Sequence, residues 1–489
     1  MASTINLSRN TKVYFTTNVD PTTGAVLETG SSATNTFQIQ VLDGYSFSQA
    51  TTQSTIQISE AGNTPSRGQR AFNTALNPVD FTFSTYIRPS LGATTGPVSA
   101  AEKVLWNALL GDGAIDATGT TVTSITRVAG TSPVIAATAS PFATVVLTAA
   151  LSKSYSGTTA TTALAAGDII NINGVAEASF NQPVRIVSVS SNTYQVEYAI
   201  APKAGTTAVI ADAVATSGQW GKGTTASSTS TSNFSYVSTM GANKNQLQKF
   251  GMIFVVDSVL YGIDNCAMDQ VSVDFGLDAI ATAAWTGKGT TLNKLNTLVA
   301  TGITASPASA KAAYITNKLS TVALISNIGG TQYAGSTTYV IPITGGNITI
   351  ANNIAYQTPT NLAVVNAPIG YYTGQRAISG NVTAYLRTGG TTDSGQLLAT
   401  LLSGGSTAVE PKYFVRLELG GSTAANRVEF EMPAAVLQIP AVNIADVVAT
   451  TINFNAQGFN SDVVNQQAFD VTNNNELLIR YYSNTPIPA

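Results

Sequence analysis

The sequence predicts a mainly β protein of several domains, in which the same succession of a turn, a strand and a helix occurs twice. Stretches in which apolar and polar residues alternate recur through the 489-residue chain, and a period of two is typical of half-buried strands. A Gly-Gln-Arg-Ala turn precedes a strand ending in Tyr, an aliphatic residue and Arg at two places, 68–88 and 374–387. An amphipathic helix follows each strand. A chain of this length is expected to fold into two to four domains.

The first part of the chain reads as strands separated by turns. We expect strands at 12–17, 37–42, 45–49 and 54–59, with Asp43-Gly44 as a turn. The stretch 66–89 then reads as a turn, punctuated by Asn77-Pro78, and an alternating strand closed by Pro89. Its counterpart at 374–387 lacks the spacer around Asn77-Pro78. A recurrence at this spacing indicates duplicated domains rather than a short-period solenoid.

Two helices are predicted at corresponding places. Ser99 and Glu102 have the spacing of a capping box, and Gly111 ends the apolar pattern of the first helix. The second helix is expected over 392–404, with an apolar face formed by four leucines, Leu397, Leu398, Leu401 and Leu402. Each helix follows its own copy of the turn and strand.

A third pair of stretches supports a duplication. Between 267–282 and 435–450, Ala, Gln, Asp, Ala and Thr coincide at one constant offset, 438 − 270 = 168. We therefore place the first unit at about 1–293 and the second at 294–459, followed by a C-terminal extension, 460–489.

The first unit contains an extra segment. From 120 to 222 the sequence has several short β patterns, and Gly-Thr-Thr stands at both flanks. We interpret 120–222 as a small all-β domain inserted in a surface loop, so that the first unit consists of 1–119 and 223–293.

The composition excludes several functions and favours assembly. Charged residues are 10% of the chain, with 23 Lys and Arg against 26 Asp and Glu. No basic patch stands out, which argues against tight nucleic-acid binding. The chain has no histidine and a single cysteine, Cys266, so the usual general base, a disulfide and a Cys-rich metal site are excluded. Weakly charged surfaces suit either an ordinary polar β protein or one buried in an assembly. We see neither a signal peptide nor a membrane span, and expect a soluble protein made in a cytoplasm.

The motifs that could carry chemistry are weak. Trp-Gly-Lys-Gly at 220–223 and Trp-Thr-Gly-Lys-Gly at 285–289 lack the first glycine of a phosphate loop and the Ser or Thr after its lysine, so turns are favoured. A cation site formed by Asp264, Asp269, Asp274 and Asp278 is disfavoured, because neighbouring members an odd number apart point to opposite faces of a straight strand. Cys266 reads as a core residue.

Ordered motifs outside 120–222 carry a family resemblance. The chain resembles the tail tube proteins of long-tailed bacteriophages, specifically the large type with two tube domains in one chain. The motifs are Leu7-Ser-Arg-Asn-Thr-Lys, Ile58-Ser-Glu-Ala-Gly, Arg67-Gly, Phe72-Asn, Leu76, Phe83-Ser-Thr-Tyr-Ile-Arg-Pro, Val104-Leu-Trp-Asn-Ala-Leu, Trp285-Thr-Gly-Lys-Gly, Tyr314-Ile-Thr-Asn-Lys-Leu, Ile341-Pro-Ile-Thr-Gly-Gly, Ile350 to Tyr356, and Thr358-Pro.

The resemblance implies a β-barrel or sandwich with a flanking helix in each unit, and an immunoglobulin-like domain as one form of decoration. It implies trimeric, pseudo-sixfold rings stacked into a tube through which DNA is ejected, in a virion tail assembled in the host cytoplasm. The implied partners are further copies of the chain, a tape measure protein, tail terminator and baseplate or tail-tip proteins, a sheath in a contractile tail, and DNA in transit. No enzymatic activity and no cofactor are implied. A cell-surface adhesin or envelope β protein is the alternative, and the missing signal peptide counts against it.

Two sets of candidate site residues follow. A wall past which DNA moves should not bind phosphates, so we expect more Asp and Glu than Lys and Arg in the lumen. The candidates are Asp269, Asp274, Asp278 and Asp446. Arg70 and Arg376 stand at matching places in the two Gly-Gln-Arg-Ala turns and are expected to make equivalent contacts. Arg88 and Arg387, which end the two strands, are further candidates for fold or assembly contacts.

Overall fold

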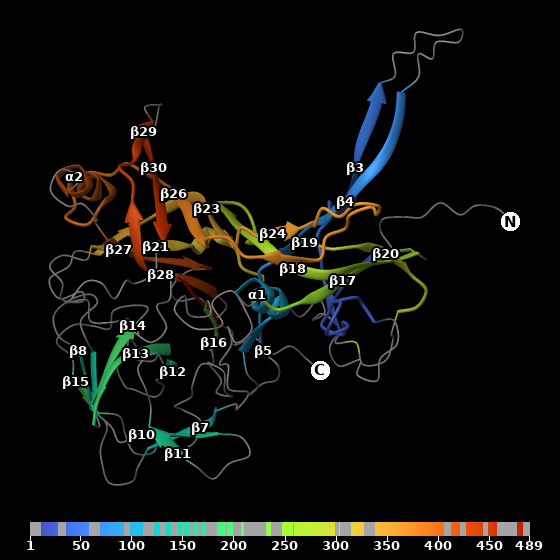
Figure 1. Cartoon of the computed structure of the whole chain (residues 1–489). Helices are drawn as coiled ribbons and strands as arrows, with labels where there is room; N and C mark the ends of the chain where they lie inside the picture. Colours follow the sequence, from blue (N-terminus) through green and yellow to red (C-terminus); the bar gives the residue numbers. More distant parts are fainter. Residues whose placement is uncertain are drawn as a thin grey trace, which may run out of the picture.

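A computed structural model of the chain shows a mainly β protein (Figure 1). The described residues are 11–27, 36–57, 69–91, 98–110, 122–127, 134–137, 145–148, 151–155, 161–163, 169–171, 183–191, 193–198, 207–209, 231–235, 247–257, 259–298, 303, 314–326, 338–404, 412–420, 427–443, 448–456 and 477–482. Within these ranges, no helix is long and apolar enough to cross a membrane.

One sheet of 18 strands dominates the fold. Its members are β1 (Lys12–Thr16), β2 (Thr36–Ile39), β3 (Ser46–Gln57), β4 (Gln69–Tyr86), β16 (Thr231–Ser235), β17 (Phe250–Val256), β18 (Val259–Gly276), β19 (Thr282–Gly289), β20 (Leu292–Leu295), β21 (Thr321–Ser326), β22 (Thr338–Ile341), β23 (Ile343–Ala351), β26 (Ala377–Tyr385), β27 (Lys412–Leu419), β28 (Arg427–Leu437), β29 (Ala441–Asn443), β30 (Ala449–Ala456) and β31 (Leu478–Tyr482). The helical elements are α1 (Lys103–Leu110), α2 (Ser394–Gly404) and a short 3-10 turn, Asn317–Leu319.

The same strand order occurs twice along the middle of this sheet. Antiparallel neighbours follow in the order β3, β4, β19, β18 and then β23, β26, β30, with the end of β28 and β29 last. We call β3, β4, β19 and β18 the first group, and β23, β26, β30 and the run from 435 to 443 the second group. The second half of β18 pairs directly with β23, so the two groups form one continuous surface.

Corresponding residues of the two groups are found from their pairing and burial. Phe83 lies opposite Trp285 in the first group and Val382 opposite Ile452 in the second, and all four side chains are buried. The offsets are 382 − 83 = 299 and 452 − 285 = 167. On the neighbouring strands Met268 corresponds to Leu437, an offset of 169, because Met268 lies opposite Gly287 and Leu437 opposite Phe454.

The constant offset of 168 seen in the sequence is therefore not a structural equivalence. It matches Thr282 with Thr450, yet Thr282 is half-buried opposite Tyr86, whereas Thr450 is buried opposite Ala384. A one-residue shift changes the face of a strand to which a side chain points. The two groups correspond when the offset is 169 for β18 and 167 for β19, which is one residue more and one residue less than 168.

The apolar core lies on one face of the sheet, beneath α1. Trp106 of α1 packs edge-on against Trp285 with ring centroids 4.8 Å apart, and also contacts Phe430 of β28. The Trp285 indole N–H donates to Thr85 Oγ1 over 2.9 Å. Since Phe430 belongs to the second unit of the predicted duplication, this core joins distant parts of the chain.

A buried polar cluster sits inside this core. The Trp106 indole N–H donates to the Tyr481 hydroxyl over 2.7 Å, and that hydroxyl donates to the Glu102 carboxylate. Burial raises the pKa of Glu102 to about 7, against the opposing effects of the Tyr481 hydrogen bond and the Arg88 charge. The capping box predicted for Ser99 and Glu102 is wrong, because Glu102 Oε1 is bound to Tyr481 and Ser99 lies in a short strand, β6 (Val98–Ala100), paired with β5 (Pro89–Leu91).

The second helix follows its prediction more closely. α2 begins after Asp393, whose Oδ1 accepts the Gln396 backbone N–H over 2.8 Å, as an N-cap does. Leu397 and Leu401 are buried, Leu398 is half-buried and Leu402 is exposed. The helix ends at Gly404 as expected.

The two groups differ in the hairpin that joins their first two strands. β3 and β4 continue outward as a long ribbon that projects from the body (Figure 1). The stretch 69–77, expected to be a turn, is part of β4, and its residues 69–76 pair with 51–57 of β3. In the second group the chain instead forms the small hairpin of β24 (Ala355–Gln357) and β25 (Gly370–Tyr372). The Tyr356 hydroxyl attaches this hairpin to β18 and β19, because it lies within hydrogen-bond distance of the Asn265 and Lys288 carbonyls, to which it donates.

The predicted insertion contains strands of its own. β7 (Val122–Arg127), β10 (Leu151–Tyr155) and β11 (Thr161–Ala163) form one sheet. A second sheet consists of β8 (Val134–Ala137), β9 (Val145–Thr148), β12 (Ile169–Asn171), β13 (Pro183–Ser190), β14 (Thr193–Tyr198) and β15 (Thr207–Val209). Each of their described pairings stays within 122–209. A separate domain over 120–222 and the other domain boundaries stay predictions.

The segment after 459 also contributes to the main sheet. β31 pairs on one side with β28 and on the other with β16, which precedes β17 in the chain. Ile479 and Tyr481 of β31 are buried. The predicted C-terminal extension therefore includes a strand that bridges early and late parts of the sequence.

Candidate functional site: the polar face of the sheet

The central strands have two chemically distinct faces, because successive side chains alternate. On one face Phe81, Val273 and Ile348 are buried in the core. Their neighbours in the chain point to the other face, which carries mostly Ser, Thr and Asn. We call this second surface the polar face.

The strand register aligns the polar-face residues in rows that run through both groups. One row consists of Ser84, Ala284, Ser272, Thr349, Ser379 and Asn455. The next row consists of Tyr86, Thr282, Asp274, Asn347, Asn381 and Asn453. Asn381 donates from Nδ2 to Asn347 Oδ1 over 3.0 Å, so the amides partly satisfy one another along the row. The face presents hydroxyl and amide groups almost throughout.

Charged residues on this face are few and mainly acidic. In the described parts of the two groups inward of the projecting ribbon, 46–50, 79–86, 267–276, 282–289, 343–351, 377–385, 435–443 and 449–456, they are Asp80, Asp269, Asp274 and Lys288. Lys288 Nζ lies 3.0 Å from Asp80 Oδ1. Three carboxylates and one ammonium give this part of the face a formal charge of −2.

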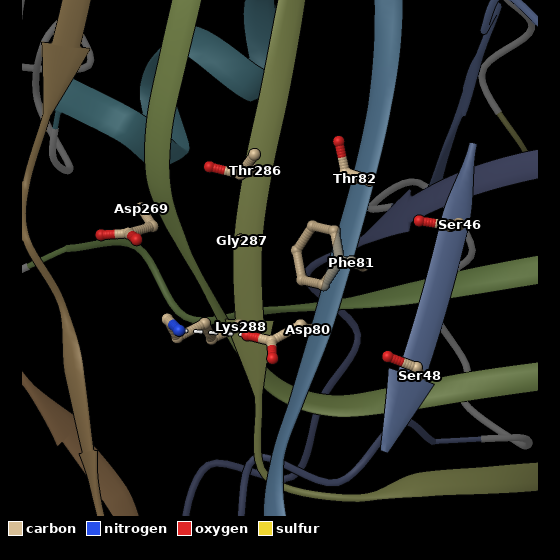
Figure 2. Close-up of a pocket in the computed structure, with 9 residues that line it drawn as sticks. All are labelled: Ser46, Ser48, Asp80, Phe81, Thr82, Asp269, Thr286, Gly287 and Lys288. Carbon is tan, nitrogen blue, oxygen red and sulfur yellow. Dashed lines mark hydrogen bonds and ion pairs between the residues drawn. The ribbon is translucent and has the colours of Figure 1, made fainter. Parts of the chain in front are cut away.

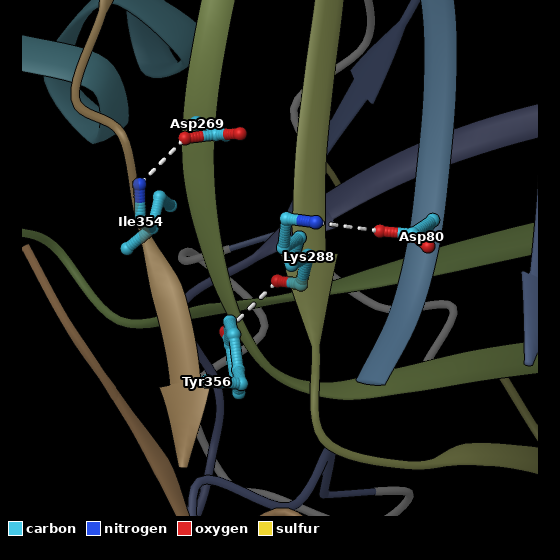
Figure 3. A network of polar contacts seen from close by, with 5 residues as sticks. All are labelled: Asp80, Asp269, Lys288, Ile354 and Tyr356. Atoms are coloured by element: carbon cyan, nitrogen blue, oxygen red, sulfur yellow. Dashed lines mark hydrogen bonds and ion pairs between the residues drawn. The ribbon is translucent and has the colours of Figure 1, made fainter. Parts of the chain in front are cut away.

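Three of these charged residues, Asp80, Asp269 and Lys288, line a pocket at the first group. The pocket has a volume of about 230 Å³ and is open to the surface (Figure 2). Its lining is formed by Ser46, Ser48, Asp80, Phe81, Thr82, Asp269, Thr286, Gly287 and Lys288. Figure 3 shows that Asp269 Oδ1 also accepts the Ile354 backbone N–H, over 2.7 Å. Asp80 and Asp269 are thus bound by neighbouring parts of the chain. Among the described residues, no group of three acidic, Cys or His side chains is arranged to hold a metal ion.

The predicted acidic residues fall at different places. Asp274 is exposed on the polar face, and Asp269 is half-buried at a register shift of β18. Asp278 is exposed in the turn between β18 and β19. Asp446 lies outside the described residues. Sequence reasoning missed Asp80 and Lys288, although their places in alternating strands would have put them opposite each other once the β4–β19 pairing was known.

Arg88 and Arg387 occupy corresponding positions, 387 − 88 = 299, and their carbonyls hold the two helix starts. The Arg88 carbonyl accepts the Ala101 N–H over 3.0 Å, and the Arg387 carbonyl accepts the Gly395 N–H over 2.9 Å. The side chains differ, since Arg88 is buried and donates to Gln40 Oε1 over 2.6 Å, while Arg387 is exposed.

Arg70 and Arg376 are not equivalent, which corrects the expectation from the turns. Arg376 immediately precedes β26, and the offset of 299 matches it with Asn77. Arg70 lies seven residues earlier, exposed on the projecting ribbon opposite Ile56. The reason is that β4 extends into the ribbon, whereas β26 begins only after the folded-down β24–β25 hairpin.

Fold and polar face together define a mainly β protein with an extended, weakly charged surface. The chain is 25% identical over 464 residues to "Tail tube protein pb6" of Escherichia phage T5, a match that covers 92% of this chain and 72% of that protein. No family model matches the chain. The similarity confirms the resemblance to a large phage tail tube protein and supports a structural tail tube protein.

Proposed function

We propose that the chain polymerises as stacked trimeric, pseudo-sixfold rings into a hollow phage tail tube, and that the polar face lines the lumen through which DNA passes into the host. The role is structural and involves no catalysis. Its partners are further copies of the chain, a tape measure protein inside the tube, terminator and baseplate or tail-tip proteins at the ends, and a sheath in a contractile tail. Assembly takes place in the host cytoplasm before the tube becomes part of the virion.

The observation that carries this proposal is the continuity of the polar face across both groups. Tight contact with DNA requires Lys and Arg that neutralise phosphates. Lys288 is the one such side chain on the described polar face, and its ammonium is paired with Asp80. A wall of hydroxyls and amides with a slight acidic excess attracts phosphates weakly and lets DNA slide past. The expectation of an acidic lumen rests on the same assignment of this face.

Labelling of assembled tubes tests which face is inside. Ser272→Cys places a thiol in the centre of the polar face. Ser190→Cys places one at the exposed last residue of β13, in the segment expected outside. The native Cys266 is buried and remains as a common background. The purified variants are polymerised, viewed by negative-stain microscopy and treated with a biotin maleimide before and after assembly, and then with streptavidin.

We expect hollow tubes in which Ser190→Cys binds streptavidin in both states. Ser272→Cys should bind it before assembly but not afterwards, because streptavidin cannot reach an interior wall. Monodisperse chains that never form rings or tubes would overturn the tube, and equal streptavidin binding at position 272 in both states would overturn the lumen assignment.

A further inference from the structure

The two ends of the central sheet carry backbone edges without partners among the described residues. At the first end, β3 pairs with β4 alone. At the other end, β29 pairs with β30 alone, and the pairing of β28 with β27 has ended at Val436. Figure 1 places β3 and β29 far apart, at opposite ends of the sheet. One chain therefore cannot join its own two edges, and open edges favour pairing with another chain.

The middle of the sheet already contains a joint of the required kind. Seven residues of β18, from Gln270 to Gly276, pair antiparallel with β23, from Ala351 to Gly345. The joint begins just after the pairing of β18 with β17 has ended at Cys266. It links the last strand of the first group to the first strand of the second group.

The open edges correspond to the two sides of this joint. By the offset of 169, Ser272 of β18 corresponds to Ala441 of β29, because Ser272 lies opposite Ala284 and Ala441 opposite Thr451. On the other side, Thr349 of β23 corresponds to Ser48 of β3.

That second correspondence follows from register and burial. Ile348 lies opposite Gly380 and Phe47 opposite Phe81, an offset of 348 − 47 = 301. Ile348 and Phe81 are buried, and Phe47 packs against the same core. Thr349 and Ser48 then both lie on the polar face.

We infer that the β3 edge of one copy of this chain pairs antiparallel with the β29 edge of the next copy, in the register of the internal β18–β23 joint. Ser48 would lie opposite Ala441, Phe47 opposite Val442 and Ser46 opposite Asn443. This inference rests on the proposed ring and names the residues of its lateral contact. Each ring then alternates internal and intermolecular versions of one joint, and the polar face continues from chain to chain.

Two local features fit this edge. Ile439, beside the unpaired stretch, is 55% exposed, so a neighbouring chain that pairs there could bury its apolar side chain. Pro440 has no N–H to donate, and proline within sheets is confined to edges and bulges, such as the register shift between β28 and β29. The proline thus costs the joint at most one hydrogen bond without preventing pairing.

Engineered cysteines test the joint and its register. Corresponding positions across antiparallel strands bring Cβ atoms to about 4.5–5.5 Å, close enough for a disulfide. A chain with Ser48→Cys and Ala441→Cys is assembled, oxidised with copper phenanthroline and separated on a denaturing, non-reducing gel. Single variants, mixed Ser48→Cys and Ala441→Cys chains, and a Ser46→Cys, Ala441→Cys pair shifted by two residues are treated in parallel. The internal pair Ser272→Cys, Thr349→Cys is the matched control, since it should close within one chain.

We expect the double variant to form covalent dimers and trimers and no larger species, the mixture of single variants to form dimers at the same rate, and the internal pair to stay monomeric with altered mobility. Preferential cross-linking of the Ser46→Cys, Ala441→Cys pair would overturn the register. Tubes seen by microscopy in which neither pair cross-links would overturn the edge pairing while leaving the tube intact. Absence of rings and tubes in the unmodified chain would instead contradict the proposed function.

Discussion

Replacing Glu102 by Gln should change how the stability of the protein depends on pH. Glu102 is buried, its Oε1 accepts the Tyr481 hydroxyl proton, and burial raises its pKa to about 7 from the ordinary 4.5. The folded state therefore holds a proton that the unfolded chain releases at lower pH. Stability supplied by this group is fully present below pH 4.5 and is lost as the pH rises through 7.

The pKa difference sets the size of the effect. Between 4.5 and about 7 it corresponds to roughly 3 kcal/mol. A Gln side chain has nearly the same shape, keeps an acceptor for Tyr481 and does not titrate. The free energy of unfolding of Glu102→Gln, minus that of the unmodified chain, should thus rise by roughly 3 kcal/mol from pH 4.5 to pH 8.

The assay is urea unfolding followed by tryptophan fluorescence at several pH values. Trp106 and Trp285 contact each other beside the cluster, so their emission reports on this region. Burial raises the pKa of Tyr481 well above its ordinary value of 10, so this hydroxyl does not titrate in the same range. A difference that stays constant within about 1 kcal/mol over this pH range would refute the reasoning, because the pKa of Glu102 would then be nearly the same in the folded and unfolded states.

Four further outcomes are expected. Leu397→Ala in α2 should lower the free energy of unfolding by roughly 2–5 kcal/mol because Leu397 is fully buried, while the control Leu402→Ala, 55% exposed, should change it by less than about 0.5 kcal/mol in the same urea titration. Gly380→Ala should destabilise the chain by about 1–3 kcal/mol, since an added Cβ would lie 2.3 Å from the Asn347 carbonyl oxygen, whereas Gly370→Ala, with nothing within 4 Å, should not lower the melting temperature. Asp80→Asn should cost less than about 1 kcal/mol, because its ion pair with Lys288 is largely exposed; a larger loss in denaturant midpoint would contradict this. Asp274→Lys should leave tube formation unchanged but slow DNA passage in reconstituted particles most at low salt, and an unchanged ejection rate would count against a lumenal position.

Local patterns predicted much of the fold. The alternation around Phe81 and Phe83 gave a strand with one buried face, and the spacing of Leu397 and Leu401 gave the buried side of α2. These signals depend on neighbours in the sequence, so they survive in the folded chain.

Features that depend on distant partners were missed. Glu102 looked like a helix cap, but its carboxylate binds Tyr481, 379 residues away. The stretch 69–77 looked like a turn because of Asn77-Pro78, yet its pairing with β3 makes it a strand. A constant offset of 168 cannot reveal that β18 and β19 are shifted in opposite directions, because only strand register shows which face each residue occupies.

The position of the polar face could not be predicted. The resemblance to tail tube proteins, together with the need for a wall that does not bind phosphates, led us to expect an acidic or neutral lumen. Asp274, one candidate for it, lies on the polar face, and the lumenal position of this face stays a proposal. Which serines, threonines and asparagines form rows could not be read from the sequence, since each row combines residues from six strands. The joint between β18 and β23 likewise follows from tertiary structure alone.

The position of β31 bears on when a newly made chain becomes complete. β16 gains its described partner only when residues 478–482, some 240 positions later, have been synthesised. The same strand delivers Tyr481 to Trp106 and Glu102. A nascent chain on the ribosome therefore has the early half of its sheet and core unfinished until translation has passed residue 482. The first half of the chain can therefore complete its sheet and core only after the C-terminal strand has been made.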